Sequence, residues 1–234
     1  AHLESLHIDC GGSKTVADST GMAMIWLNHA GENRIVVIAG ANAALDAAHV
    51  EREQARIAAA GILLLQLETP LEGVIRAAAI ARAHGVRTIL NPAPATKLPR
   101  ELLANLDLIT PNETEAERLT GIAVQDENSA ARAAAALHAQ GVPTVLITLG
   151  SRGVYASADG HGTLYPAYRV QPVDTTAAGD TFNGALAAAL LRGEPLARAI
   201  AWGQAAAALS VQTLGAQPSI PDAAATTAFL QDHS

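Results

Sequence analysis

The strongest constraint on the fold of this chain is a regular alternation of short apolar runs and longer helical patterns that begins after Asn42. Apolar runs typical of buried strands cover 61–66, 86–90, 106–109 and 143–149. Helical patterns cover 46–59, 70–83, 113–119, 129–140, 177–191, 195–213 and 223–231. Repeated strand, helix, strand units predict an α/β fold, with helices on both faces of a largely parallel sheet and ligands beyond the carboxyl ends of its strands.

Two other regions predict antiparallel strands. Short apolar or alternating runs at 15–17, 21–27 and 35–39, with a turn at 28–31, are typical of a small hairpin. Runs at 153–158, 162–165 and 168–171, broken by glycine and proline, predict an antiparallel meander at the edge of the sheet. We therefore expect two parts, a helix remnant with a partial β lid over 1–40 and an α/β domain over 41–234.

Composition narrows the class of protein. The 234 residues are 50% hydrophobic but only 3% aromatic, which predicts a sizeable core of closely packed aliphatic side chains. A net charge of -7 argues against broad contact with a nucleic-acid backbone. The single cysteine, Cys10, excludes an intrachain disulfide and a cysteine-rich zinc site. The sequence shows neither a secretory pattern nor a run of about 18 apolar residues, so we expect a cytoplasmic protein without membrane contact.

Small residues open a long apolar helix in the segment Asp174-Thr-Thr-Ala-Ala-Gly-Asp-Thr-Phe-Asn-Gly184. Unpaired amide groups at a helix N-terminus form an anion site, so Ala177, Ala178 and Gly179 are candidates to hold a phosphoryl group during transfer. Asp180, in the same first turn, is placed to accept a hydroxyl proton as an alcohol attacks phosphorus. The alternative is that Asp180 only stabilises the start of the helix.

This segment resembles the carboxyl-terminal signature of the ribokinase or pfkB family of carbohydrate kinases. The sequences Asn-Glu-Thr-Glu at 112–115 and Thr-Leu-Gly-Ser-Arg-Gly at 148–153 resemble the family's magnesium and nucleotide motifs, and 91–94 and 215–219 resemble its ribokinase branch. The resemblance implies a three-layer αβα sandwich with a partial antiparallel β lid. It also implies ATP as co-substrate, Asp180 as catalytic base, and an anion hole at Gly179, Ala178 and Ala177.

The same resemblance implies a nucleotide site in which Glu115 holds Mg²⁺ through water and Gln204 borders the adenine. The implied ATP-binding residues are Asn112, Thr148, Leu149, Gly150, Ser151, Arg152, Gly153, Gly179 and Gln204. Local structure alone could also account for these residues: Asn112 and Glu115 suit a capping pair, the glycines of 148–153 suit a tight hairpin, and a helical glutamine is commonly exposed.

A potassium site and a sugar contact complete the implied set. The K⁺ positions are Asp174, Thr176, Ser210, Thr213, Gly215 and Ser219, several of them acting through backbone carbonyls. Glu68, after the strand at 61–66, matches an acid that contacts the sugar, as Asp180 does, because a carboxylate accepts hydroxyl hydrogens. Ser219 could instead be an ordinary loop serine, and Glu68 an ordinary surface glutamate.

The resemblance implies phosphorylation of D-ribose at its 5-hydroxyl. The alternatives are a related kinase for deoxyribose, fructose or a nucleoside, and a noncatalytic nucleotide-binding module. A dehydrogenase is disfavoured because Gly-x-Gly-x-x-Gly is absent, and Gly-Gly-Ser-Lys at 11–14 lacks the glycine spacing of a phosphate loop.

Family members carry a further N-terminal portion ahead of the region matched here, so the match covers about three quarters of a family member by domain proportions. We therefore expect an exposed sheet edge, poor stability or aggregation of this chain alone, and an incomplete sugar site. Many family members dimerise through lid strands, so the resemblance makes a homodimer through these strands an expectation.

Overall fold

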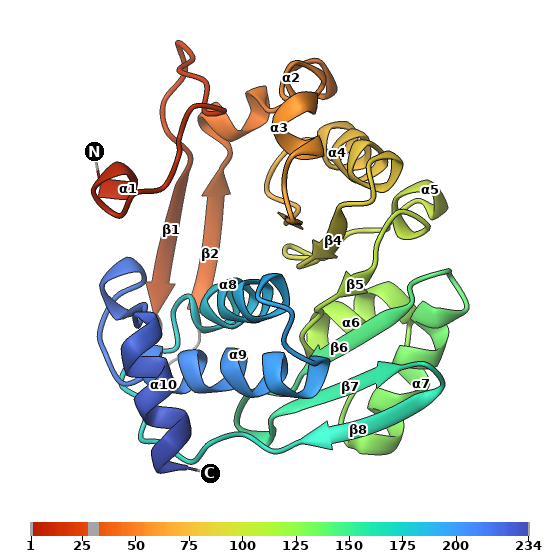
Figure 1. The fold of residues 1–234 in the computed structure, drawn as a ribbon, viewed down its shortest axis with the longest axis vertical. Coiled ribbons are helices and arrows are strands. Elements are labelled where there is room, and N and C mark those ends of the chain that lie inside the picture. Colours follow the sequence, from red (N-terminus) through yellow and green to blue (C-terminus); the bar gives the residue numbers. More distant parts are fainter. Residues whose placement is uncertain (1, 28–32, 234) are drawn as a thin grey trace.

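The computed structural model describes residues 2–27 and 33–233. At its centre lies a six-stranded sheet in the order β3-β4-β5-β6-β7-β8 (Figure 1). The strands are β3 (Ile62–Leu65), β4 (Arg87–Leu90), β5 (Leu108–Ile109), β6 (Thr144–Thr148), β7 (Val154–Ala158) and β8 (His161–Tyr165). Strands β3 to β6 are parallel, and β7 and β8 continue the sheet as an antiparallel edge. The predicted α/β class and largely parallel sheet are confirmed.

Alternating side chains of the strands build two separate cores, one on each face of the sheet. Leu90, Ile109 and Ile147 pack under one group of helices, whereas their neighbours Ile89 and Leu146 pack under another. The first group is α4 (Leu71–Ala83), α5 (Arg100–Leu103), α6 (Glu113–Thr120) and α7 (Glu127–His138). The second is α8 (Ala178–Leu191) and α9 (Leu196–Ser210). The result is the three-layer αβα sandwich that the family resemblance implied.

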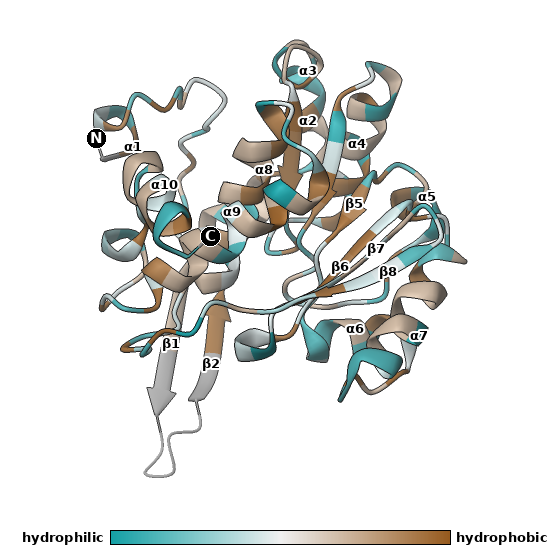
Figure 2. Cartoon of the chain, turned by 60° about the horizontal axis from the view of Figure 1, so that its bottom comes forward, coloured by the Kyte–Doolittle hydropathy of each residue, from teal (hydrophilic) through white to brown (hydrophobic). Residues whose placement is uncertain are grey.

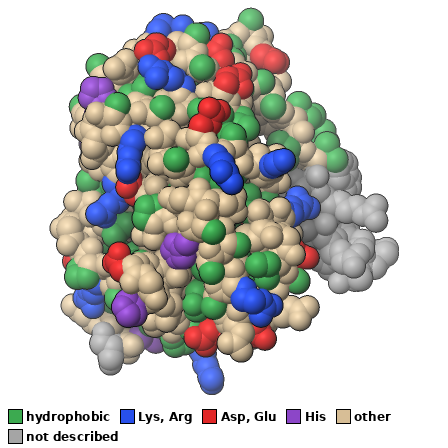
Figure 3. Space-filling view, turned by 90° about the vertical axis from the view of Figure 1, so that its right-hand side faces the viewer, with side chains coloured by type: hydrophobic (Ala, Val, Ile, Leu, Met, Phe, Trp, Pro, Cys, Tyr) green, Lys and Arg blue, Asp and Glu red, His purple; other side chains and the backbone are tan. Residues whose placement is uncertain are grey.

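The helix layers pack mainly through small and aliphatic side chains, as the composition predicted. Ala189, Ala199 and Leu186 are fully buried where α8 and α9 meet the sheet. Figure 2 shows hydrophobic residues concentrated in the central strands and hydrophilic residues on the outer surfaces of the helices. On the face in Figure 3, acidic and basic side chains are interspersed over the surface.

The remaining helices lie at the two ends of the sandwich. The short helices α2 (Ala47–Arg52) and α3 (Gln54–Ala58) pack on α4, and α10 (Ala223–Asp232) packs on α9. The N-terminal helix α1 (His2–Ser5) is a single turn. Within the described residues, no helix is both long enough and apolar enough to span a membrane.

A second, two-stranded antiparallel sheet pairs β1 (Met22–Leu27) with β2 (Asn33–Ile38). This confirms the small antiparallel sheet expected near the N-terminus, while the predicted turn at 28–31 lies outside the described residues. Among the described side chains of this hairpin, Met22, Met24 and 36–38 are exposed. The division of the chain into 1–40 and 41–234 stays a prediction.

The structure corrects four details of the element prediction. The helix expected over 46–59 is divided at Glu53 into α2 and α3, and the short helix α5 was not predicted. Residues 15–17 form no strand, because no neighbouring strand pairs with them in the described chain. Residues 168–171 also form no strand, and the ring of Tyr168 instead packs edge-on against Phe229 of α10.

Candidate active site

A pocket of about 220 Å³ opens where the carboxyl ends of β4, β5 and β6 face the N-terminus of α8. This is the position expected for a ligand in a parallel α/β sheet. Its lining residues are Asn91, Ala93, Thr110, Asn112, Glu115, Thr148, Thr175, Ala177, Ala178, Gly179, Asp180 and Asn183. The pocket therefore brings together the predicted anion hole, the predicted base and the predicted Mg²⁺ acid, from separate parts of the sequence.

The first turn of α8 has the features of an anion site. Its N-cap, Ala177, adopts a left-handed conformation with φ 59° and ψ 13°, and no side chain caps the helix. Among the described residues, no backbone carbonyl accepts a hydrogen bond from the amides of Gly179 or Asp180. The side chains of 177–179 are methyl groups or hydrogen, so an anion can reach these amides. Asp180 is exposed in the same turn, beside the pocket.

Asn112 and Glu115 form the capping box that the local pattern predicted. The Asn112 side chain accepts a hydrogen bond of 2.8 Å from the Glu115 amide, and a Glu115 carboxylate oxygen accepts one of 2.8 Å from the Asn112 amide. Both residues also line the pocket, so capping and a functional role are compatible here. Glu115 keeps its second carboxylate oxygen for a ligand.

The environment of Glu115 suits a cation. Burial raises the pKa of Glu115 above its usual value, and the nearby Asp180 carboxylate acts in the same direction. The Asn112 amide and the Arg118 guanidinium lower this pKa, but they do not offset the burial. A divalent ion held by Glu115 through water would offset the cost of its buried charge, so this carboxylate fits Mg²⁺.

The predicted nucleotide loop joins β6 to β7. The Thr148 amide donates a hydrogen bond of 2.9 Å to the Pro111 carbonyl, which holds the end of β6 beside the start of α6. Residues Gly150–Arg152 form a single 3-10 turn, and Gly153 ends it with φ 106° and ψ -140°. The hairpin interpretation of the two glycines is confirmed, because β6 and β7 are antiparallel neighbours.

Of this loop, only Thr148 lines the pocket, while Leu149 is buried and 150–152 are exposed. The Arg152 guanidinium contacts the Glu113 carboxylate at 2.5 Å and also donates to the Gln125 carbonyl. Arg152 therefore ties the loop to α6 and to the segment that leads into α7.

Gln204 is buried rather than exposed, contrary to the common behaviour of a helical glutamine. Its amide nitrogen donates hydrogen bonds of 3.0 Å to the Tyr165 carbonyl and 3.2 Å to the Pro166 carbonyl. These bonds fix the chain as it leaves β8. Gln204 does not line the pocket, and its contact with adenine stays a prediction.

The predicted potassium residues lie outside the pocket lining, in the loop before α8 and in the region around the end of α9. One Asp174 oxygen accepts hydrogen bonds from the Thr176 amide at 2.9 Å and hydroxyl at 2.6 Å, and the other accepts from the Gly215 amide at 2.9 Å. The bonds from the Thr176 hydroxyl, the Gly215 amide and the Thr176 amide hold the pKa of Asp174 below its usual value.

The two serines of this set already make local hydrogen bonds. Ser210 donates to the Ala207 carbonyl, and Ser219 donates to the Ala216 carbonyl. Their hydroxyl oxygens and the loop carbonyls can still act as acceptors, which fits a monovalent cation coordinated mainly by oxygen.

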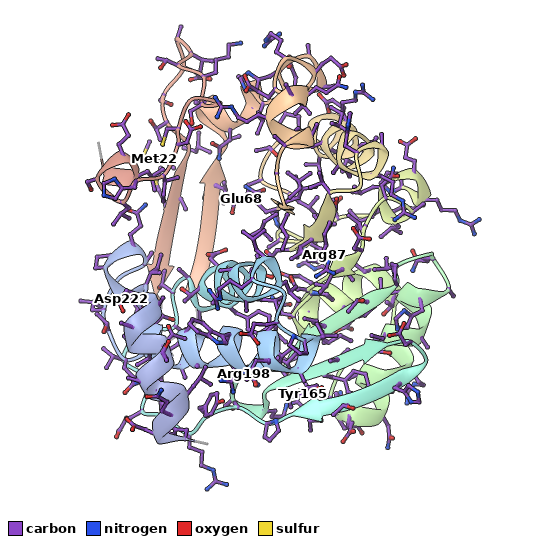
Figure 4. The ribbon with its side chains drawn as sticks, in the orientation of Figure 1. Met22, Glu68, Arg87, Tyr165, Arg198 and Asp222 are labelled. Atoms are coloured by element: carbon purple, nitrogen blue, oxygen red, sulfur yellow. The ribbon has the colours of Figure 1, made fainter. Side chains whose placement is uncertain are left out.

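Glu68 lies in the loop after β3, where its amide donates to the side chain of Gln66 (Figure 4). It is not among the residues that line the pocket with Asp180. Its contact with the sugar therefore stays a prediction.

Sequence reasoning assigned no individual role to Asn91, Ala93, Thr110, Thr175 and Asn183, which also line the pocket. Asn91 and Thr110 directly follow β4 and β5, so their place at the carboxyl ends of buried strands was a usable signal. Asn183 gave no such signal, because it lies within an apolar helix.

A model of the pfkB family of carbohydrate kinases matches residues 1–223. The chain belongs to this family. Ribokinase of Haemophilus influenzae is 51% identical over 225 residues, which are 96% of this chain and 74% of that protein. Among solved structures, Arabidopsis thaliana ribokinase in complex with ribose and ATP superposes with a TM-score of 0.87 at 36% identity, over 92% of this chain and 70% of that one.

Ribokinase from Thermotoga maritima also superposes with a TM-score of 0.87, at 37% identity, over 98% of this chain and 75% of that one. Membership of the pfkB family identifies the chain as a carbohydrate kinase.

Proposed function

We propose that this chain carries the nucleotide-binding and catalytic part of an ATP-dependent kinase that phosphorylates D-ribose at its 5-hydroxyl. The observation that carries the proposal is Asp180, which stands in an uncapped helix turn with free amides, in one pocket with Glu115. The relatives named ribokinase, one of them solved with ribose and ATP, support ribose as the sugar.

In the proposed reaction Asp180 accepts the proton of the attacking hydroxyl, while the unpaired amides of Gly179 and Asp180 hold the transferring phosphoryl group. The attacking oxygen, phosphorus and leaving oxygen lie in line, so most of the catalysis is positioning and charge stabilisation. Mg²⁺, held through water by Glu115, would neutralise charge on the phosphates. Residues 148–153, together with Asn112 and Gln204, are the proposed contacts of the nucleotide.

The loops that contain Asp174 and Gly215 are proposed to hold K⁺ beside the anion hole. A cation there would strengthen the field at the start of α8, because Asp174 lies just before its first turn. Substitution of Asp174 by asparagine should therefore weaken the activation of turnover by K⁺ in a titration against Na⁺. An identical response to the two ions in the original chain would contradict the potassium site.

The function is tested by coupled kinase assays with ATP and each of D-ribose, deoxyribose, fructose and a nucleoside. The highest kcat/KM is expected for D-ribose, and a preference for a nucleoside would refute the assignment. Asp180→Ala should lower kcat by about 10²–10⁴-fold, the usual contribution of a general base. ATP affinity, measured by calorimetry, should change little, which also separates an enzyme from a noncatalytic nucleotide-binding module.

Asp222→Ala is the matched control. Asp222 is the N-cap of α10, where its carboxylate accepts a hydrogen bond of 2.7 Å from the Ala225 amide (Figure 4). Loss of this cap should cost about 1 kcal/mol of stability and leave kcat unchanged. If Asp180→Ala behaved in the same way, Asp180 would only stabilise its helix.

We also propose that two copies associate through the β1–β2 sheet, whose described side chains expose Met22, Met24, Val36, Val37 and Ile38. Val37→Lys should convert a dimer to a monomer in light scattering after gel filtration. Leu191→Lys, which charges an exposed apolar position on α8, should not. A chain that is monomeric at all concentrations would refute the association.

A cytoplasmic location stays a prediction.

A further inference from the structure

Two buried polar side chains connect the first turns of α8, which contain Asp180, to the carboxyl end of the central strand β5. Thr110 follows β5 and is 1% exposed, and Asn183 lies one turn into α8 and is 3% exposed. The Thr110 hydroxyl donates a hydrogen bond of 2.7 Å to the Asn183 side-chain oxygen. The Asn183 amide in turn donates one of 2.9 Å to the carbonyl of Gly179. We call this chain of bonds the Thr110–Asn183 relay.

The end of the relay at the sheet is fixed by one backbone bond and one side-chain bond. The Thr110 amide donates to the Leu90 carbonyl at 2.9 Å, and the Asn91 side chain donates to the Thr110 carbonyl at 3.3 Å. The Thr110 hydroxyl has one proton and two nearby acceptors. Because the Leu90 carbonyl is 3.5 Å away and Asn183 only 2.7 Å, the proton belongs to the bond with Asn183.

The helix end of the relay is a turn that has little other support. No side chain caps α8, and its N-cap Ala177 is in a left-handed conformation. Within the described chain, no other side-chain hydrogen bond ties residues 177–183 to the sheet, and the buried hydroxyl of Thr181 has no partner. Apolar packing of Phe182 and Leu186 holds the helix on the sheet, but it is not directional.

We infer that Thr110 and Asn183 are positioning residues: they hold the Gly179 peptide, and with it the amides beside Asp180, in register with the carboxyl ends of β4 and β5. This inference rests on the proposed phosphoryl transfer, since it assigns how the anion hole of that reaction is held. A catalytic group displaced by about 1 Å costs on the order of 10²-fold in rate, so a fixed turn matters most in the transition state.

Thr110→Val is the main test, because valine keeps the shape of threonine and removes the donor to Asn183. We expect kcat to fall by about 10–100-fold, while the Kd for ATP stays within about threefold, because the ground state tolerates a looser turn than the transition state. The rate of each variant is divided by the fraction of chains that bind ATP, which calorimetry gives as the binding stoichiometry. A partly unfolded sample therefore does not produce a false decrease in kcat. Thr110→Ser, which restores the hydroxyl, should recover most of the rate.

Thr88→Val is the matched control on the neighbouring strand. Thr88 is fully buried near the start of β4, and its hydroxyl contacts the Val86 carbonyl at 3.4 Å. This variant should lose a similar hydroxyl without a change in kcat.

A second readout does not depend on turnover. Hydrogen exchange of peptides that cover 174–184 should quicken in Thr110→Val, but not in Thr110→Ser or Thr88→Val. Unchanged exchange in Thr110→Val would overturn the relay, and faster exchange with full kcat would overturn its role in catalysis. Absence of ATP binding in the original chain would instead refute the proposed function, and the exchange data would still decide whether the relay holds the turn.

Discussion

Gly153 offers the sharpest test of how the proposed nucleotide loop, residues 148–153, is built. With φ 106° and ψ -140°, it occupies a conformation that residues with a side chain rarely adopt. A Cβ added there would lie 2.0 Å from the Tyr165 carbonyl oxygen and 2.8 Å from the Ala167 nitrogen. Both contacts are backbone atoms, so no side chain can turn away to make room.

Neither partner can move freely. The Gly153 carbonyl accepts a hydrogen bond of 2.8 Å from the Leu149 amide, and the segment opposite is held by Gln204 through the carbonyls of Tyr165 and Pro166. Backbone strain at such a position costs about 1–3 kcal/mol, and overpacking a buried site costs about 1–3 kcal/mol more. Gly153→Ala should therefore lose about 2–6 kcal/mol of folding free energy.

In a chain of this size each kcal/mol lowers Tm by about 2–4 °C, so the expected loss is about 4–24 °C. Thermal unfolding followed by circular dichroism measures it, and calorimetry should show a weaker ATP affinity as the loop shifts. Gly150→Ala is the matched control in the same loop. Gly150 has φ 55° and nothing within 4 Å of the added Cβ, so its cost is only about 1–2 kcal/mol. A Gly153→Ala Tm equal to that of Gly150→Ala would refute the steric argument.

Two further predictions concern carboxylates with shifted pKa values. The pKa of Glu115 is raised by burial, so the stability that this group contributes is complete below its ordinary value of 4.5 and is lost as pH rises through the raised pKa. Glu115→Gln keeps the acceptor of the capping bond but carries no charge. This variant should unfold at a higher temperature than the original chain at pH 7 but not at about pH 4, and its Mg²⁺-dependent turnover should fall. Equal melting temperatures of the two proteins at both pH values would contradict the effect of burial on Glu115. The pKa of Asp174 is lowered by the Thr176 hydroxyl and the Gly215 amide, so its contribution is present above its ordinary value of 3.8 and is lost as pH falls through the lowered pKa. Asp174→Asn should be less stable to urea than the original chain at about pH 7, and the difference in unfolding free energy should shrink below about pH 4. A difference that persists unchanged at about pH 2 would show that the charge of Asp174 does not contribute to stability.

Local sequence patterns predicted the parts of the fold that depend on neighbours in the chain. The capping box of Asn112 and Glu115 was predictable because its two residues are three positions apart. The buried strands β4 and β6 were predictable because their apolar runs are short and bounded by turn residues. The helix α5 was not, since its four residues carry too little periodicity to distinguish them from a loop.

The direction of a polar side chain was harder to predict than the element that carries it. Gln204 was placed on a helix correctly, but its burial depends on the chain leaving β8, which passes close enough to accept two hydrogen bonds. Residues 168–171 have the alternation of a strand, yet the segment pairs with no strand, and Tyr168 packs on Phe229 and His233 instead. In both cases the deciding partner is far away in the sequence.

The segment 174–184 shows why the proposed anion site needs support from residues outside it. Small residues leave its amides uncovered, but the same choice leaves no side chain to cap α8. The structure anchors the segment from both sides instead: Asp174 binds the Gly215 amide ahead of the turn, and Asn183 binds Gly179 and Thr110 behind it. Thr110 is 73 positions away from Asn183, so the sequence alone shows an asparagine in an apolar helix and no partner. A buried side-chain amide without a partner is costly, so Asn183 in an apolar helix requires a distant partner, and that partner, Thr110, fixes the proposed catalytic turn.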